Sequence, residues 1–209
     1  MLRMGGKERR MCKATGFFLF MLFAFKSNAQ LLDSAALAQE PVFDNLQEAL
    51  KDPDKVYRLH LVKMKLTHIP VEVYQFKNLQ ELDLNKNRIK ELPDSISMLT
   101  NLQILNLSKN ELQILPAAIG KLINLRKLVV NQNNLTALPP ALGDLENLRV
   151  LDLWSNDISF WPDQLANLKK LRHMDVRSIL IPDDEIKKLQ ELLPNTEINY
   201  DPSCHCSGG

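Results

Sequence analysis

Residues 79–101 read LQELDLNKNRIKELPDSISMLTN, and residues 102–124 repeat the same pattern as LQILNLSKNELQILPAAIGKLIN. Two more copies follow at 125–147 and 148–170, one precedes them at 56–78, and a partial copy occupies 171–178. Self-similarity at a fixed period indicates a repeat architecture in which each copy packs against its neighbours. Because the leucine positions recur in each copy, 38 of the 209 residues are leucine. The repeat predicts a solenoid.

Each copy follows the pattern LxxLxLxxNxLxxLPxxIxxLxx, and each part of it predicts a structural role. Leucines that alternate with polar residues, such as Leu82 and Leu84, are typical of a half-buried strand. A proline such as Pro93 lacks a backbone donor and fixes the turn toward the outer side. A buried asparagine can satisfy the backbone groups of adjacent loops, so we assign the recurring asparagines to the scaffold rather than to a ligand site. They are Asn87, Asn110, Asn133 and Asn156.

This pattern closely resembles the leucine-rich repeat family in its plain 23-residue class, as an exported, bacterial-like member. The resemblance extends from Val56 to about Tyr200. It implies an α/β fold, a right-handed solenoid or horseshoe with a parallel β-sheet on its concave face. It also implies an interaction module without chemistry of its own, although the family binds so many partners that the fold does not identify one.

Solenoids need caps at both ends. We expect residues 30–55 to form the N-terminal cap region, with a helix over 43–51 that begins after Asp44 as N-cap. Residues 179–200 are expected to form the C-terminal cap, with a helix from Asp183 to Leu193 followed by a last edge strand. Residues 201–209 are predicted to be a disordered tail.

The first 29 residues have the pattern of a secretory signal peptide. A basic stretch precedes the apolar run FFLFMLFAF at 17–25, and small residues at Ser27 and Ala29 mark a cleavage site. Nine residues rise only about 14 Å as a helix, too little to cross a bilayer. Cleavage after Ala29 would leave 20 basic and 24 acidic residues and no membrane span. We expect a secreted, periplasmic or cell-envelope protein; the alternative is a cytoplasmic signalling scaffold.

The composition gives little support to an enzyme or a nucleic-acid-binding protein. The 26 Lys and Arg residues nearly balance 25 Asp and Glu, whereas binding to phosphates needs a basic excess. We find no phosphate-binding loop, nucleophile elbow or zinc-spaced Cys/His set, and predict no catalytic residue, metal or cofactor. Asp152 and Asp175, expected about 5 Å apart on adjacent strands, are interpreted as part of a charged face.

The functional surface is expected on the concave face, where strand residues that alternate with the buried leucines form columns. An exposed apolar cluster that contains a tryptophan and has a charged rim is typical of a protein-binding hot spot. Alternatives are binding of polysaccharide or peptidoglycan, since a tryptophan can stack on a sugar ring, and a purely structural envelope protein. The predicted partner-binding residues are Asp83, Ile104, Asn106, Lys127, Val129, Asn131, Val150, Asp152, Trp154, Asp175 and Arg177.

The last residues, Cys204-His205-Cys206-Ser-Gly-Gly, are not explained by the repeat. We expect a monomer. In an oxidising compartment, an intermolecular disulfide through Cys204 or Cys206 is possible.

Overall fold

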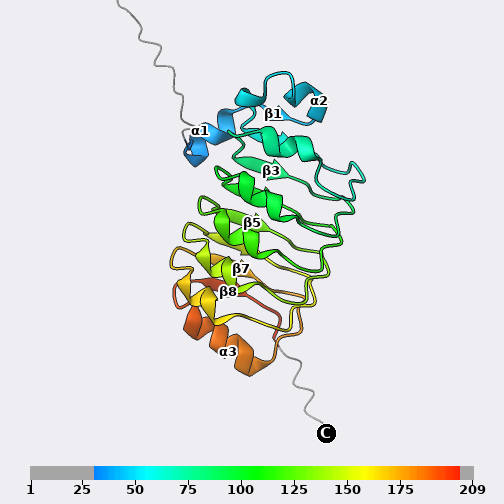
Figure 1. Cartoon of the computed structure of the whole chain (residues 1–209). Coiled ribbons are helices and arrows are strands. Elements are labelled where there is room, and N and C mark those ends of the chain that lie inside the picture. Colours follow the sequence, from blue (N-terminus) through cyan, green and yellow to red (C-terminus); the bar gives the residue numbers. More distant parts are fainter. Residues whose placement is uncertain (1–30, 203–209) are drawn as a thin grey trace, which may run out of the picture.

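The computed structural model describes residues 31–202, which form a curved solenoid around one eight-stranded parallel sheet in the order β1 to β8 (Figure 1). One strand and one outer segment come from each 23-residue repeat, which confirms the predicted α/β solenoid. The strands are β1 (Val42–Phe43), β2 (Arg58–His60), β3 (Glu81–Asp83), β4 (Ile104–Asn106), β5 (Lys127–Val129), β6 (Val150–Asp152), β7 (His173–Asp175) and β8 (Glu197–Asn199).

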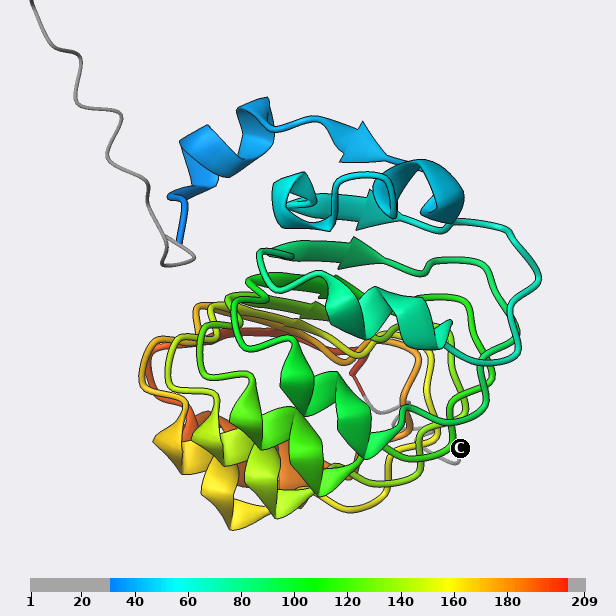
Figure 2. The ribbon, with the colours of Figure 1, turned by 45° about the horizontal axis from the view of Figure 1, so that its top comes forward.

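The outer side is made of short 3₁₀ helices, each beginning after the recurring proline. They stack on one another on the side of the sheet opposite the concave face (Figure 2). They are η2 (Val71–Gln75), η3 (Asp94–Met98), η4 (Ala117–Lys121), η5 (Pro140–Asp144) and η6 (Asp163–Asn167), and η1 (Pro53–Lys55) belongs to the N-terminal cap.

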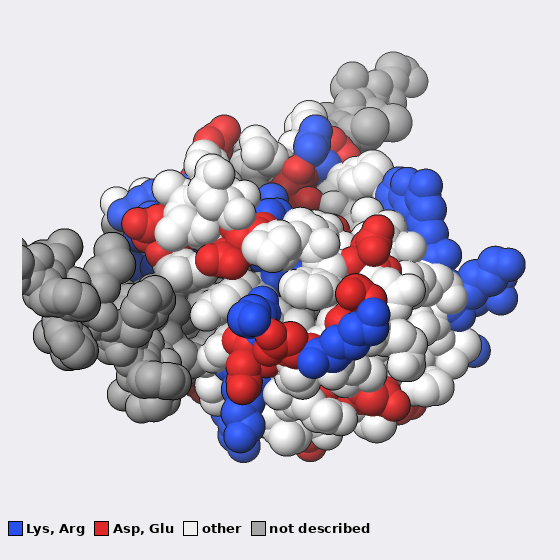
Figure 3. Space-filling view, turned by 90° about the horizontal axis from the view of Figure 1, so that it is seen from above, with Lys and Arg blue, Asp and Glu red and all other residues white. Residues whose placement is uncertain are grey.

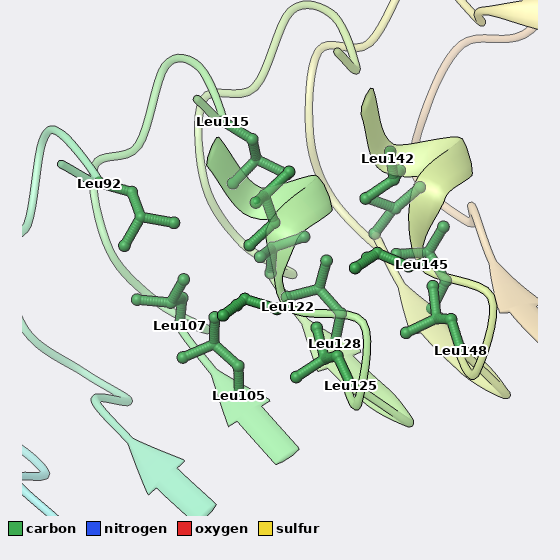
Figure 4. Close-up of a cluster of buried hydrophobic side chains, with 14 of the residues drawn as sticks. Leu92, Leu105, Leu107, Leu115, Leu122, Leu125, Leu128, Leu142, Leu145 and Leu148 are labelled. Carbon is green, nitrogen blue, oxygen red and sulfur yellow. The ribbon is translucent and has the colours of Figure 1, made fainter. Parts of the chain in front are cut away.

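The leucines fill the space between the sheet and the outer segments. Leu105 and Leu128 point inward from adjacent strands, and Leu122 and Leu145 meet them from the ends of the outer helices (Figure 4). These side chains have no exposed surface. Burial of a leucine stabilises the fold by roughly 1.5–3 kcal/mol, and the stacking of equivalent positions extends one core along the whole solenoid.

The buried asparagines have the structural role that the sequence predicts. The Asn110 side chain accepts a hydrogen bond from the Ile89 amide at 3.0 Å and donates to the carbonyls of Leu84 and Leu107, each at 3.0 Å. It thereby joins the loops of two successive repeats. Asn87, Asn133 and Asn156 make equivalent bonds.

A second row of asparagines also links the repeats, and the sequence analysis missed it. Each of its members donates a side-chain hydrogen bond of 2.6–2.8 Å to a backbone carbonyl 24 residues earlier. Asn124, for example, binds the carbonyl of Thr100. The row consists of Asn78, Asn101, Asn124 and Asn147, and its recurrence every 23 residues was a usable signal.

The N-terminal cap differs from the prediction. The expected helix over 43–51 is shortened to α2 (Leu46–Ala49), and its N-cap is Asn45 rather than Asp44. The Asn45 side chain accepts from the amides of residues 47 and 48, while Phe43 is drawn into β1, which pairs with β2. The residue at which the helix was expected to begin, Phe43, therefore pairs with the first repeat strand instead.

An unpredicted helix, α1 (Ser34–Gln39), precedes β1 and lies beside the sheet (Figure 2). Its N-cap, Asp33, accepts hydrogen bonds from the amides of Ala35 and Ala36, and Leu37 is its one buried residue. We call residues 31–39 the N-terminal strap, because the segment before the helix binds across two repeats. The Leu32 amide donates to Gln80 Oε1 at 2.9 Å, and its carbonyl accepts from Gln103 Nε2 at 2.8 Å.

At the other end, α3 (Asp183–Leu192) covers the last repeat and β8 extends the sheet. Asp201, the first residue of the predicted tail, accepts a 2.7 Å hydrogen bond on its carboxylate from the Ser178 amide. The proposed signal peptide and the Cys204-His205-Cys206 segment lie outside the described residues. Within 31–202, no helix has the length and hydrophobicity needed to span a membrane.

Candidate interaction surface

The parallel register places the predicted surface residues in columns, in which successive members lie on adjacent strands. In the first column, Ile104 pairs with Lys127 and Lys127 with Val150; in the second, Val129 pairs with Asp152. The full first column is Arg58, Glu81, Ile104, Lys127, Val150, His173 and Glu197, and the second is His60, Asp83, Asn106, Val129, Asp152, Asp175 and Asn199. Residues two positions after the second column, including Asn131, Trp154 and Arg177, flank it. We call this set the concave face.

The apolar part of the concave face is smaller than predicted. Ile104, Val150 and Trp154 are half-buried and reach solvent, but Val129 is only 9% exposed. Val129 lies between Asn106 and Asp152 in its column and offers a partner little surface, so its role as a contact residue stays a prediction. The Trp154 indole is oriented by a 3.2 Å hydrogen bond from Nε1 to Ser178 Oγ.

Amide–carboxylate pairs hold the polar residues of this face in place. Asn106 Nδ2 donates to Asp83 Oδ2 at 3.1 Å, and Asn131 Nδ2 donates to Asp152 Oδ2 at 2.6 Å. The second oxygen of Asp83 accepts from the amide of Asn85. These carboxylates are therefore fixed by short local bonds, which lowers the entropy that a partner would have to remove on binding.

Toward the C-terminal end, the side chains of this face pair with one another. Arg177 donates to both oxygens of Asp175, with an Nη2–Oδ2 distance of 2.6 Å, and His173 lies 3.0 Å from Glu197. Partial burial acts to raise the pKa of Asp175, but the hydrogen bonds from Arg177 outweigh it and lower the pKa overall. Among residues 31–202, no group of three His, Cys, Asp or Glu side chains is placed to hold a metal ion.

Near the N-terminal end, Arg58, His60 and Glu81 form a cluster that the sequence analysis did not single out. Glu81 Oε2 lies 2.8 Å from Arg58 Nε, and Oε1 lies 2.6 Å from His60 Nε2. The hydrogen bond to His60, aided by the Arg58 guanidinium, lowers the pKa of Glu81 to about 2 against the opposing effect of burial. Arg58 also donates to the carbonyls of Ala38 and Glu40, so the cluster joins the strap to the sheet.

A groove of about 390 Å³ lies between α1 and the first column of the concave face. We call it the α1 groove. Three predicted surface residues, Ile104, Lys127 and Val150, line it, and the sequence analysis could not find it because α1 was not predicted. Its other lining residues are Ser34, Leu37, Ala38, Arg58, Glu81, Gln103, Arg126 and Arg149.

Charge is distributed unevenly over the surface. Viewed from the N-terminal cap, acidic and basic side chains are interspersed (Figure 3). Along the starts of β5 to β7, basic residues are grouped and a second hollow of about 340 Å³ is lined by basic residues alone. We call this group the basic edge; it consists of Arg126, Lys127, Arg149, Lys170 and Arg172.

Comparison with known proteins agrees with this architecture. A model described as "leucine-rich repeat region" matches residues 49–132, and one described as "leucine rich repeat" matches 123–178. No curated protein gives a significant match. The chain is similar to the structure of a leucine-rich repeat protein of Leptospira interrogans, with 33% identity, a TM-score of 0.63, and coverage of 76% of this chain and 46% of that one.

Two further structures share the architecture. Internalin C2 of Listeria monocytogenes is 25% identical over 73% of this chain and 64% of its own, with a TM-score of 0.60. A plant peptide hormone receptor, solved in complex with RGF2, is 31% identical over 68% of this chain and 23% of its own, with a TM-score of 0.53. The chain thus spans less than two thirds of the length of each of these proteins. Because two family models together match residues 49–178 and the strands of the sheet recur every 23 residues, the chain belongs to the leucine-rich repeat family.

Proposed function

We propose that this chain is a non-enzymatic module that binds a partner protein on its concave face. Leucine-rich repeat domains commonly serve in protein–protein interaction, and one similar structure is a receptor complex. The observation that carries the proposal is the arrangement of Ile104, Val150 and Trp154, which reach solvent among fixed charged and amide groups. An aromatic anchor beside oriented polar groups is typical of an interaction hot spot.

The proposal is tested with the double variant Ile104→Thr/Trp154→Ala. The full chain serves as bait, and the partner that it captures is then titrated against each variant by calorimetry. The matched control is Ile114→Thr/Phe160→Ala, which truncates the same kinds of side chain at exposed positions outside the concave face. We expect the concave variant to bind the partner at least about tenfold more weakly, as for loss of a hot-spot residue, and the control to bind normally.

Equal binding by both variants would contradict the concave-face proposal. Circular dichroism and thermal unfolding must show that both variants are folded. Competition by soluble saccharides, together with binding that is insensitive to salt, would instead favour a polysaccharide ligand. Val129 is left unchanged, because a polar group at this shielded position would perturb folding.

We also propose that the protein is exported. The support is the basic and apolar pattern of residues 1–29. N-terminal sequencing of the protein from a cell-free culture medium or an envelope fraction tests export: a chain that begins at Gln30 is expected, and an intact Met1 in the cytoplasm would contradict it.

A further inference from the structure

The backbone at the strand starts places one residue of each repeat in a further column beside the concave face. The amides of Gln103, Arg126, Arg149 and Arg172 each donate to the carbonyl of the preceding member at 2.8–2.9 Å, and the first acceptor is Gln80. Equivalent side chains thus follow one another at one strand spacing, about 4.8 Å. This column changes from two glutamines to three arginines along the solenoid.

The glutamine part of this column already binds the backbone of one strap residue. Leu32 of the strap donates to Gln80 and accepts from Gln103, with bonds of 2.9 and 2.8 Å. A glutamine amide can donate and accept, so it suits both groups of a peptide unit. The strap then leaves the column at Ser34, whose hydroxyl lies 3.4 Å from Arg126 Nη1. The backbone of Leu32 thus shows that a chain can bind across two neighbouring members of this column.

Within residues 31–202, the arginine part of the column lacks acidic partners; Arg149 and Arg172 are exposed, and Arg126 is half-buried beside Ser34. No ion pair within the described residues involves Arg126, Arg149 or Arg172, nor the adjacent Lys127 and Lys170. Guanidinium groups only donate, and they bind carboxylates in a planar, bidentate geometry. Unlike the glutamines, these residues cannot accept from a peptide N–H; they can bind carbonyl groups, as Arg172 does with the carbonyls of Lys169 and Leu171, but a carboxylate also matches their charge.

The neighbouring α1 groove supplies an apolar surface. Leu37 and Ala38 line it from α1, and Ile104 and Val150 line it from the sheet, beside Arg126 and Arg149. Aliphatic and basic groups thus lie next to each other along three adjacent strands, β4 to β6. An extended segment, whose successive side chains point to opposite sides, could direct carboxylates to the arginines and aliphatic side chains to the groove.

We infer that the α1 groove and the basic edge bind an extended acidic peptide segment in which carboxylate and aliphatic residues alternate. This inference rests on the proposed function and specifies the chemistry of the bound protein. The segment continues the line of the strap, with arginine–carboxylate pairs in place of the bonds that Gln80 and Gln103 make to Leu32.

The direct test uses a synthetic peptide of sequence ELEVE, blocked at both ends, with QLQVQ and EGEGE as comparison probes. Binding to the full chain is measured by fluorescence anisotropy at two salt concentrations. We expect ELEVE to bind more tightly than either comparison peptide, and its affinity to fall as salt rises. Equal binding of QLQVQ would overturn the role of charge, and equal binding of EGEGE would overturn the role of the apolar groove.

The variant Arg126→Gln/Arg149→Gln tests the residues, since glutamine occurs naturally in this column at 80 and 103. Removal of two charge-assisted contacts is expected to weaken ELEVE binding about tenfold or more. The control Arg88→Gln/Lys121→Gln removes the same charge outside this edge and should bind as the native chain does. Comparable weakening in both variants, or none in either, would overturn the inference.

Other occupants give distinct results. Polygalacturonate that binds the basic edge as tightly as ELEVE would indicate an acidic polysaccharide and overturn the peptide inference. A dimer in sedimentation that the Arg126→Gln/Arg149→Gln variant abolishes would indicate a second copy and also overturn it. If the captured partner no longer binds Ile104→Thr/Trp154→Ala but still binds Arg126→Gln/Arg149→Gln, the inference fails while the proposed function stands. If the partner still binds both variants, the inference and the proposed function both fail.

Discussion

Asn110 illustrates how a single side chain can connect two repeats. Its amide group bonds to backbone groups on both sides of it, at distances of 3.0 Å, in a site that is nearly closed to solvent. The half-buried Asn124 donates a hydrogen bond to the carbonyl of Thr100. The two asparagines recur with the same period, but they differ in how many buried groups depend on them.

Replacement of Asn110 by alanine is expected to lower the free energy of unfolding by roughly 2–3 kcal/mol, because buried donors and acceptors lose their partner. Asn124→Ala is the matched control and should cost about 1 kcal/mol or less. Urea denaturation followed by circular dichroism measures both values. Similar losses in the two variants would contradict the distinction between the buried and half-buried asparagine rows.

Glu81 is expected to make stability depend on acid pH. Its pKa falls from 4.5 to about 2 in the folded chain, so the folded state binds this proton more weakly than the unfolded state does. The resulting stabilisation is complete above about pH 5 and is lost as the pH falls toward 2. Because Glu81 is only partly buried, we expect a contribution of roughly 2 kcal/mol at neutral pH.

Thermal unfolding of Glu81→Gln across pH 2–7 measures this contribution. The native chain should be more stable than the variant at pH 7, and the difference should shrink toward pH 2. Glu146→Gln, at an exposed position, is the control for loss of one surface carboxylate. A native–Glu81→Gln difference that stays constant with pH would contradict the assigned titration.

At the scale of elements, the outer 3₁₀ helices stack more closely than the sequence pattern alone indicates. Gly120 in η4 and Gly143 in η5 occupy the repeat position that Ser97 occupies in η3. A β-carbon at Gly143 would collide with the carbonyl oxygen of Gln164 in η6, and one at Gly120 would collide with that of Ala141. The backbones of η4, η5 and η6 therefore approach to a distance that excludes a side chain.

Gly143→Ala is accordingly expected to destabilise the fold by roughly 2 kcal/mol, because a backbone carbonyl can move less easily than a side-chain end. Ser97→Ala, at the equivalent position of η3, removes one exposed 2.7 Å bond to the Asp94 carbonyl and should cost about 0.5 kcal/mol. Chemical denaturation compares the two. A neutral Gly143→Ala would show that η5 and η6 can separate without cost.

At the scale of the whole molecule, a solenoid depends on its ends, because each repeat contacts only its neighbours. At one end, the strap, β1 and α2 cover the first repeat; at the other, α3 packs Leu189, which is fully buried, against the last. Loss of a cap contact should therefore weaken the nearest repeats most.

Leu189→Ala is expected to reduce stability by about 2–5 kcal/mol through loss of buried surface and creation of a cavity. Hydrogen exchange should increase first in β7 and β8 and least in β2. Leu192→Ala, at a half-buried position of the same helix, should have a smaller effect. A uniform increase over all eight strands would indicate that the solenoid opens as one cooperative unit.

Much of the fold could be read from the sequence, because the 23-residue period encodes contacts between equivalent positions of adjacent repeats. The leucine columns, the buried asparagine row and the register that aligns Ile104 with Lys127 all follow from that period. Most of the predicted concave residues accordingly lie in adjacent columns. Their binding of a partner remains a proposal.

What the sequence by itself determined is thus the set of contacts that repeat; what the tertiary structure alone decided is the set that does not. The strap contacts Gln80 through Leu32, 48 residues earlier in the chain, and Arg126 through Ser34, 92 residues earlier. No recurring sequence pattern predicts either contact. The α1 groove depends on that strap, and the shielding of Val129 depends on its particular neighbours. Such contacts depend on shape and packing in three dimensions. A periodic sequence pattern predicts only the contacts that recur between adjacent repeats.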